Sequence, residues 1–209
     1  KIFILGIFKI PSTSMENTLL PGDQILVSKL HYGSRLPQSP FEISWINVLF
    51  YLNKKARSRI DSTWWKYMRL QGYSKVSQGD VLVFDFPGKN NGTDFVKRCV
   101  GLPGDTLQIK HGTVYIDKKK IKMPHHAKSG ISEIICDSVP TAFPYNKQFL
   151  WTADNFGPLI IPQKGMTIEL TKQNYFLYGS TISDYEGFPI YIENDTVKCN
   201  GEHLNQYSF

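Results

Sequence analysis

The sequence predicts a mostly β fold, with an antiparallel β-barrel-like core and a second, smaller β-rich lobe inserted into it. Three stretches begin with Gly-Asp and continue with alternating apolar and polar residues, which is typical of a tight turn that leads into a strand. They read "PGDQILVSK", "QGDVLVFDFP" and "PGDTLQIKHG" and contain Gly22, Gly79 and Gly104. In addition, residues 104–121 and 187–204 align without gaps as a weak repeat, each in the order strand, turn, strand, turn, short strand.

Length and composition indicate a globular chain. The chain has 209 residues, of which 41% are hydrophobic and 20% are charged, and this composition excludes disorder as the main state. The net charge of +6 favours an anionic partner, either a membrane surface or nucleic acid. The aromatic content of 13% favours the membrane surface. Because the basic run at 118–120 falls in a predicted hairpin turn, we expect no nucleic-acid partner.

The chain begins with an apolar stretch, residues 2–8. This stretch is far shorter than the roughly 20 residues that a membrane-spanning helix needs, and no small-residue cleavage site follows it, so it is a poor secretion signal. Two interpretations stay open. The stretch is the first strand of the domain, or it is the last part of a membrane anchor that begins upstream; both hold if the anchor runs directly into the strand.

Residues 41–73 differ from the strands on either side, because their apolar residues fit short helices or a loop better than strands. This segment combines aromatic and basic residues. The two groups are Trp45, Trp64, Trp65, Tyr67 and Met68, and Lys54, Lys55, Arg57 and Arg59. Two interpretations are open: an aromatic cluster that closes one end of the barrel, or a patch at a membrane interface.

The second copy of the repeat belongs to the predicted lobe, and its Asn200-Gly201 pair is a strong signal for a two-residue hairpin. An irregular, proline-containing stretch, residues 123–165, separates the two copies. We therefore expect a core over residues 1–112, with 41–73 as an insertion, and a β-rich lobe over residues 113–209 whose return to the core is truncated.

No metal site or cofactor is expected. Adjacent residues of an extended chain point to opposite sides, so His125 and His126 are poorly placed to join Cys136 or Asp137 around one ion. The three cysteines form no Cys-x-x-Cys pair. A single disulfide among them stays open.

Two stretches carry the residues for a chemical reaction. "KIPSTSMENTLLPGDQILVSK" places Ser12 and Ser14 one residue apart, and "DFVKRCVGLPGD" places Lys97 inside an apolar strand. The chain has no Gly-x-Ser-x-Gly elbow and no Gly-rich phosphate loop. Serine needs a base to become a nucleophile, and a lysine serves as that base when apolar surroundings disfavour its charged form. The neighbours Phe95 and Val96 predict such surroundings for Lys97.

These two stretches, together with "DVLVFDFP", resemble the bacterial type I signal peptidases, which are membrane-anchored Ser–Lys proteases that remove signal peptides from exported proteins. The matching blocks cover about a quarter of the chain and follow the order of the family. The resemblance implies that Ser14 is the nucleophile and that Lys97 is the general base. It also implies that Ser12 donates a hydrogen bond to the oxyanion together with the backbone N–H of Ser14.

The resemblance also implies how substrate binds. Family substrates bind as an extended strand, with shallow pockets for the small residues before the cleavage site. By position, the pocket residues are Phe8, Ile10, Met15, Phe95 and Val96, and Arg98 and Asp105 have structural roles near the site. The implied partners are signal peptides of secreted preproteins and the membrane lipid surface. The implied location is the cell (inner) membrane, with a single- or two-pass anchor upstream and the catalytic domain on the extracytoplasmic side.

Two departures from the family pattern stand out. Asn17 occupies the position of a proline that usually follows the nucleophile, and the late Gly-Asp-Asn-Arg segment with its serine is absent. Without that segment, we expect Arg98 to lack the acidic partner that is usual in the family, and Lys97 to lack the family's orienting serine. We expect that the polypeptide is a fragment of a signal peptidase. The alternative is a non-catalytic relative that binds signal peptides.

Overall fold

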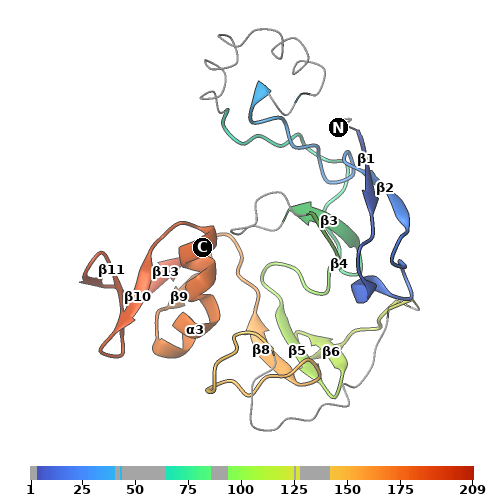
Figure 1. Ribbon diagram of the computed structural model, residues 1–209. Helices are drawn as coiled ribbons and strands as arrows, with labels where there is room; N and C mark the ends of the chain where they lie inside the picture. The colour runs from blue at the N-terminus through green and yellow to red at the C-terminus, as the bar shows by residue number, and fades with distance from the viewer. Residues whose placement is uncertain (1–3, 41–42, 44–64, 86–93, 125, 128–141) are drawn as a thin grey trace. The chain divides into compact units, whose positions relative to one another are not determined.

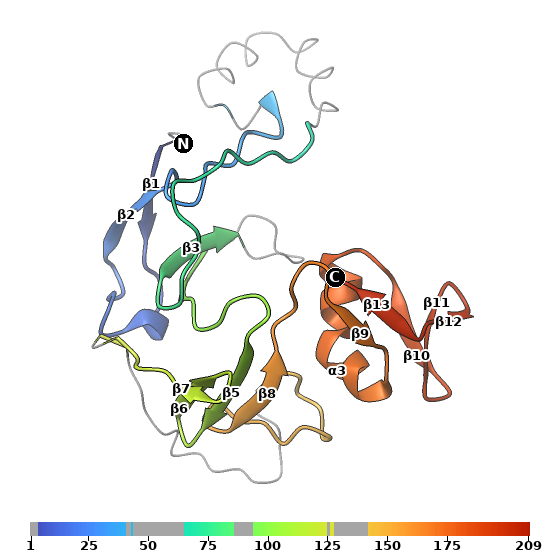
Figure 2. The same cartoon turned by 180° about the vertical axis from the view of Figure 1, so that it is seen from behind.

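The computed structural model describes residues 4–40, 43, 65–85, 94–124, 126–127 and 142–209. The chain divides into two compact units, Lys1–Ser77 and Gln78–Phe209, which are drawn in Figure 1 and, from behind, in Figure 2. All strand pairs in both units are antiparallel among the described residues. The prediction of a mostly β, antiparallel fold is therefore confirmed, although the described strands form open sheets of two to four strands and no closed barrel. The predicted boundary at residue 112 stays a prediction.

The first unit begins with a two-stranded hairpin. Strand β1 (Leu5–Lys9) pairs with β2 (Gln24–Ser28), so that Ile7 lies opposite Leu26. The interpretation of the N-terminal apolar stretch as a first strand is thus confirmed for residues 5–8, whereas residues 2–3 lie outside the described residues. Between the two strands the chain forms one turn of 3-10 helix, η1 (Thr13–Met15).

A long-range pairing makes up most of the remaining described residues of the first unit. Residues 31–38 and 65–74, which we call the ribbon, run side by side (Figure 1) and exchange backbone hydrogen bonds. Four backbone amides donate to carbonyls of the opposite segment at 2.7–3.0 Å: Trp65 to Gln38, Leu36 to Met68, Leu70 to Ser34, and Ser74 to His31. Near the end of the ribbon the backbones cross at Gly33 and Gly72, where a Cβ on Gly72 would lie 2.4 Å from the nitrogen of Gly33. Of the predicted 41–73 insertion, residues 65–73 contain no helix, and 41–42 and 44–64 lie outside the described residues.

The described residues of the second unit form four sheets. Strands β3 (Val81–Asp85) and β4 (Asp94–Arg98) form a hairpin. A four-stranded sheet has the order β7-β6-β5-β8, from β5 (Thr106–Lys110), β6 (Thr113–Ile116), β7 (Lys119–Lys120) and β8 (Phe156–Ile160). Towards the C-terminus, β10 (Ile190–Glu193), β11 (Thr196–Cys199) and β12 (Glu202–His203) form a meander, and β9 (Thr167–Glu169) pairs with β13 (Gln206–Ser208) (Figure 2).

The predicted repeat is present in the backbone. Strands β5, β6 and β7 correspond to β10, β11 and β12, and each connection has two residues with positive φ, as hairpins with two-residue loops require. These pairs are His111 and Gly112, Asp117 and Lys118, Asn194 and Asp195, and Asn200 and Gly201, with φ from 47° to 88°. The amides of Ile121 and Leu204 donate to the carbonyls of Val114 and Val197 in the equivalent way. The repeat and the Asn200-Gly201 hairpin are therefore confirmed.

All three predicted Gly-Asp turns are confirmed, and they share one function in the fold. Gly22, Gly79 and Gly104 have φ of 93–95°, a conformation that glycine adopts without steric cost. In each turn, one residue of a neighbouring segment makes two backbone hydrogen bonds of 2.8–2.9 Å. Its carbonyl accepts from the glycine amide, and its amide donates to the aspartate carbonyl. These residues are Ile10 for the first turn, Cys99 for the second and Ile161 for the third. We call this pair of hydrogen bonds the Gly-Asp clamp.

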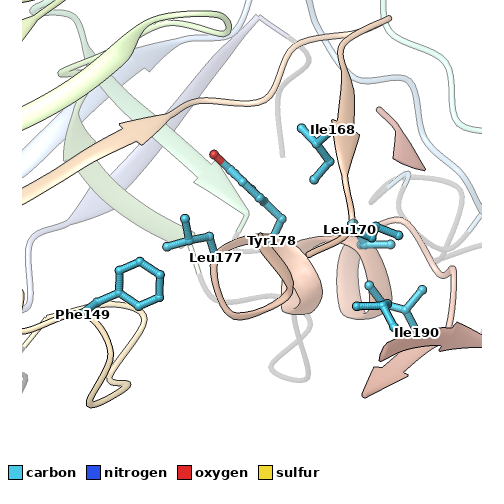
Figure 3. Packing of buried hydrophobic residues seen from close by; sticks show 8 residues of the cluster. Phe149, Ile168, Leu170, Leu177, Tyr178 and Ile190 are labelled. Atoms are coloured by element: carbon cyan, nitrogen blue, oxygen red, sulfur yellow. The ribbon is translucent and has the colours of Figure 1, made fainter. Parts of the chain in front are cut away.

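The main hydrophobic core of the described residues lies in the C-terminal part of the second unit. Helix α3 (Lys172–Ser180) continues into a π-helical turn, η3 (Thr181–Tyr185), and packs its buried residues against the two small sheets (Figure 3). The core residues are Phe149, Ile168, Leu170, Leu177, Tyr178, Ile182, Ile190 and Val197. The Tyr178 hydroxyl donates to the carbonyl of Ile160 at 3.0 Å, so the one polar group of this core is satisfied.

None of the helices in the described part of the chain is long and apolar enough to span a bilayer. Among the same residues, no group of three His, Cys, Asp or Glu side chains is arranged to hold a metal ion. Cys99 and Cys199 are free thiols, and His125, Cys136 and Asp137 lie outside the described residues.

Candidate active site

The two serines lie together on the segment that links β1 to β2. Ser12 has an extended backbone, with φ −137° and ψ 164°, and the following 3-10 turn brings Ser14 back towards it. The two Oγ atoms are 3.3 Å apart and both residues are exposed. The next residue, Met15, is buried. The turn therefore exposes its serine hydroxyls to solvent, while the buried Met15 side chain fixes its position.

The serine segment is closed at its base by the first Gly-Asp clamp. The Ile10 amide donates to the Asp23 carbonyl at 2.9 Å, and Gly22 donates to the Ile10 carbonyl at 2.8 Å. The Asp23 carboxylate also accepts from the amide of Leu20 at 2.7 Å. The backbone of Ile10, two residues before Ser12, is therefore held by hydrogen bonds at both its amide and its carbonyl. The Ile10 side chain is also buried.

Asn17, which occupies the position of the family's proline, has a left-handed backbone with φ 72°. Asparagine is one of the few residues that adopt this conformation readily, whereas the proline ring locks φ near −65°. The loop after Ser14 therefore follows a path that a proline at this position does not allow.

We expect Asn17→Pro to lower the free energy of unfolding by at least about 1 kcal/mol, because the native φ is incompatible with the ring. Asn17→Gly is the matched control and should be nearly neutral, since glycine populates positive φ. Urea denaturation of both variants provides the measurement. A proline variant as stable as the unchanged protein would contradict the left-handed conformation of this turn.

Lys97 lies in β4, opposite Leu82 of β3, and its side chain is exposed. The apolar surroundings predicted from its sequence neighbours are therefore not formed by β3 and β4. The reason is the alternation of side chains along a strand: Val96 and Arg98 point to the opposite face. On its own face Lys97 has Phe95 as its nearest neighbour along β4, and the ring of Phe95 stacks on Phe84 with the centroids 6.3 Å apart.

The end of β4 is held by the second Gly-Asp clamp and by two side chains. Cys99, two residues after Lys97, exchanges backbone hydrogen bonds of 2.8 Å with Gly79 and Asp80. Arg98 donates from Nη1 to the carbonyl of Gly79, and Gln78 donates from Nε2 to the carbonyl of Val100, both at 2.8 Å. Sequence reasoning missed the role of Gln78, because nothing in a single glutamine indicates a partner 22 residues away.

Cys99 carries a thiol two residues after Lys97 in the sequence. Burial raises the pKa of its thiol, and the carboxylates of Asp80 and Asp105 raise it further. The thiolate is the reactive form of cysteine, so these surroundings disfavour the reactive form of Cys99. The residue instead lines a small cavity of about 90 Å³ with Gln78, Arg98 and Met123.

Asp105 makes a side-chain hydrogen bond within its own turn, and its place near the active site stays a prediction. Its carboxylate accepts from the amide of Leu102 at 2.7 Å, as Asp23 does for Leu20 in the first unit. The two Leu-Pro-Gly-Asp turns therefore have the same geometry, and the aspartate side chain stabilises each of them.

The predicted pocket residues divide between the two units. Phe8, Ile10 and Met15 belong to the serine segment, where Ile10 and Met15 are buried and Phe8 is half-buried. Phe95 and Val96 are half-buried in β4. The structure brings Ser12 and Ser14 together in the first unit and places Lys97, Arg98 and Asp105 in the second. The pairing of Ser14 with Lys97 stays a prediction.

Comparison with known proteins gives consistent results. The family model for signal peptidase, peptidase S26, matches residues 1–184. Signal peptidase I of Buchnera aphidicola subsp. Baizongia pistaciae is 39% identical over 107 residues, which cover 51% of this chain and 26% of that protein. Signal peptidase I of Pseudomonas aeruginosa is 34% identical over 116 residues, which cover 55% of this chain and 31% of that protein. That of Rickettsia prowazekii is 28% identical over 122 residues, 58% of this chain and 39% of that protein. The chain thus spans between a quarter and two fifths of the length of these relatives.

Proposed function

This chain belongs to the signal peptidase family, peptidase S26, and we propose that it supplies the reactive residues of a serine endopeptidase that removes N-terminal signal peptides from exported preproteins. The nucleophile is Ser14 and the general base is Lys97. The Ser14 hydroxyl attacks the carbonyl carbon of the scissile peptide bond as its proton passes to the neutral amine of Lys97. The resulting ammonium protonates the leaving amine, and water then hydrolyses the acyl-enzyme.

Ser12 stabilises the tetrahedral intermediate in this proposal. Its Oγ lies 3.3 Å from that of Ser14, so a hydroxyl donor stands beside the oxygen that forms the covalent bond. The backbone N–H of Ser14 is the second donor. Two such donors are the usual arrangement for holding the negative charge on an oxyanion.

The observation that carries the proposal is that backbone hydrogen bonds hold both segments on which the predicted reactive residues lie. Each is anchored by a Gly-Asp clamp two residues from the predicted functional residue, at Ile10 before Ser12 and at Cys99 after Lys97. Such anchoring holds reactive side chains in place before substrate arrives, which is the main structural requirement for rapid acyl transfer.

Substrate binding accounts for the exposure of Lys97. Among the described residues, β4 pairs with β3 alone, so its second edge can receive an extended peptide as an added strand. A peptide in this position covers the exposed amine with apolar atoms and favours its neutral form. Phe95 and Val96 of β4, and Phe8, Ile10 and Met15 of the serine segment, are the residues we propose for the shallow pockets that accept the small residues before the cleavage site.

The proposed partners and location follow from this function. The substrates are signal peptides of secreted preproteins, and the enzyme works at the lipid surface of the cell (inner) membrane. We infer one or two membrane spans upstream of residue 1, with the described units on the extracytoplasmic side, where signal peptides emerge.

A second proposal is a non-catalytic relative that binds signal peptides, and the exposure of Lys97 is the observation that favours it. The two proposals differ in one experiment. A synthetic peptide that spans a signal-peptide cleavage site is incubated with the protein that carries this chain, and binding and cleavage are both measured. Cleavage after the small residue supports the peptidase, and saturable binding without product supports the non-catalytic relative.

Ser12→Ala should lower kcat by about 10²–10³ and leave KM almost unchanged. The reason is that the hydrogen bond to the oxyanion strengthens only as charge develops in the transition state. Steady-state kinetics on the same synthetic peptide provides the measurement. Thr13→Ala, on the same 3-10 turn, is the control and should keep normal rates. A Ser12→Ala variant with a normal kcat would return Ser12 to the role of a simple turn residue.

A further inference from the structure

The turn that leads into β3 forms a β-bulge against the end of β4. Gly79 and Asp80 together lie opposite Cys99, whose carbonyl accepts from the Gly79 amide and whose amide donates to the Asp80 carbonyl, both at 2.8 Å. Gly79 has φ 94°, so this is the type of bulge that begins with a left-handed glycine. Such a bulge bends its strand and increases the local twist, and bulges are common beside active sites, where they redirect a side chain. This one lies two residues beyond Lys97, the proposed general base.

Gln78 distinguishes this turn from the other two Gly-Asp turns. The residue before the glycine is Pro21 in the first turn and Pro103 in the third, and a proline ring stiffens a turn from within because it fixes φ. Glutamine has no such ring. Its side chain instead donates from Nε2 to the carbonyl of Val100 at 2.8 Å, so the turn is fastened to the chain three residues after Lys97.

A second side chain runs in the opposite direction across the bulge. Arg98 donates from Nη1 to the carbonyl of Gly79 at 2.8 Å. Two backbone and two side-chain hydrogen bonds therefore join residues 78–80 to residues 98–100. Together they extend the β3–β4 pairing past the last residue of β4 and fix the twist at which that strand ends.

Packing does not replace these hydrogen bonds. A cavity of about 90 Å³ lies beside the bulge, and its lining includes Gln78, Val100, Ile121 and Met123. A polar-walled space of this size admits water, and water can bond to the Val100 carbonyl in place of the glutamine amide. A mobile water does not fix the direction of the chain. Loss of the Gln78 donor should therefore loosen the end of β4 and cost the fold little.

We propose that Gln78 is a positioning residue for Lys97. By tying Val100 to the turn before β3, its side chain fixes the twist at the end of β4 and with it the direction of the Lys97 side chain. Gln78 thus acts through the backbone of β4 and has no direct part in the chemistry. This role rests on the proposed peptidase function, since it adds a residue to that reaction.

The first test is kinetic and uses the protein that carries this chain with a synthetic signal-peptide substrate. Gln78→Met keeps an unbranched side chain of similar length but has no donor. It should lower kcat about 10- to 100-fold and change KM by less than about twofold, because a small displacement of a catalytic group costs rate. Gln78→Lys restores an N–H donor and should recover most of the rate. Gln206→Met, at an exposed position of β13, is the matched control and should keep normal rates.

The pH profile separates position from charge. Gln78→Met leaves the charge of the protein unchanged, so kcat should fall by the same factor at every pH. A profile displaced along the pH axis would mean that Gln78 acts on the protonation of the Lys97 amine, and the positioning role would be wrong.

Hydrogen exchange provides a readout that needs no cleavage. In Gln78→Met, peptides that cover residues 97–100 should exchange about three- to tenfold faster, because local opening then breaks one hydrogen bond fewer. Peptides from helix α3 should exchange as before, and the melting temperature should fall by less than about 4 °C. Unchanged exchange at residues 97–100, or equal acceleration along the whole chain, would contradict the proposal.

The outcomes distinguish this proposal from the proposed function. Normal cleavage by Gln78→Met, or a loss in Gln78→Lys as large as that in Gln78→Met, contradicts the positioning role alone. An unchanged protein that binds the peptide and does not cleave it contradicts the peptidase function, and the positioning role falls with it.

Discussion

Ser14→Ala is expected to reduce signal-peptide cleavage to background, a loss of roughly 10⁴–10⁶ in kcat. The alanine has no oxygen with which to form the acyl-enzyme, and the oxyanion donors alone provide only a small part of the rate. Because Ser14 is exposed on a one-turn 3-10 helix, the substitution should leave the fold and the binding of peptide intact. The measurement is product formation from a synthetic signal-peptide substrate, together with the binding affinity of that peptide.

The acyl-enzyme provides a second measurement for Ser14. Acid quenching during turnover followed by mass spectrometry should detect a covalent peptide adduct on residues 12–15 of the active protein and none on the Ser14→Ala variant. An adduct that persists in the variant would place the nucleophile elsewhere. Thr13→Ala, which removes the neighbouring hydroxyl of the same turn, should form the adduct normally.

Lys97→Met should abolish cleavage to a similar extent, because the thioether cannot accept the proton of the serine. The side chain is exposed in β4, so an unbranched residue of similar length should cost little stability, and a matched Lys119→Met on β7 should keep normal rates. Lys97→Arg is the sharper variant. It retains a positive charge but does not lose its proton in proteins, so it should be as inactive as the methionine variant.

The pH dependence separates a basic role of Lys97 from a structural one. The rate of the unchanged protein should rise with pH, because only the neutral amine accepts a proton. A Lys97→Arg variant that cleaves at the normal rate would mean that a cation, and not a base, is needed at this position. A rate that is independent of pH would lead to the same conclusion.

Local sequence was sufficient for the turns and the repeat. Gly22, Gly79 and Gly104 could be identified as turn residues because positive φ is strongly tied to glycine, and Asn200-Gly201 could be identified as a hairpin for the same reason. These conformations depend on a few neighbouring residues and hardly on the rest of the chain. The serine and lysine blocks likewise predicted the signal peptidase family, to which the chain belongs.

Helix α3 was not predicted, because its sequence "KQNYFLYGS" has no helical periodicity. The segment is helical in its tertiary context: Leu177 and Tyr178 pack into the core, and Thr171 caps the first turn by accepting from the Asn174 amide. Tertiary packing routinely overrides weak local preference of this kind.

The surroundings of Lys97 and the path of the ribbon were also decided by tertiary structure. Sequence neighbours predicted an apolar setting for Lys97, but residues adjacent in a strand point to opposite faces, so burial depends on which segment covers each face. In the same way, Leu36 pairs with Met68 and Cys99 pairs with the Gly79-Asp80 turn through hydrogen bonds between distant segments. A backbone amide and carbonyl are the same chemical groups in every residue, so the sequence of one segment alone does not specify its partner. The turn residues of this protein were therefore determined locally, whereas the clamps beside Ser12 and Lys97 were determined only when the segments packed together.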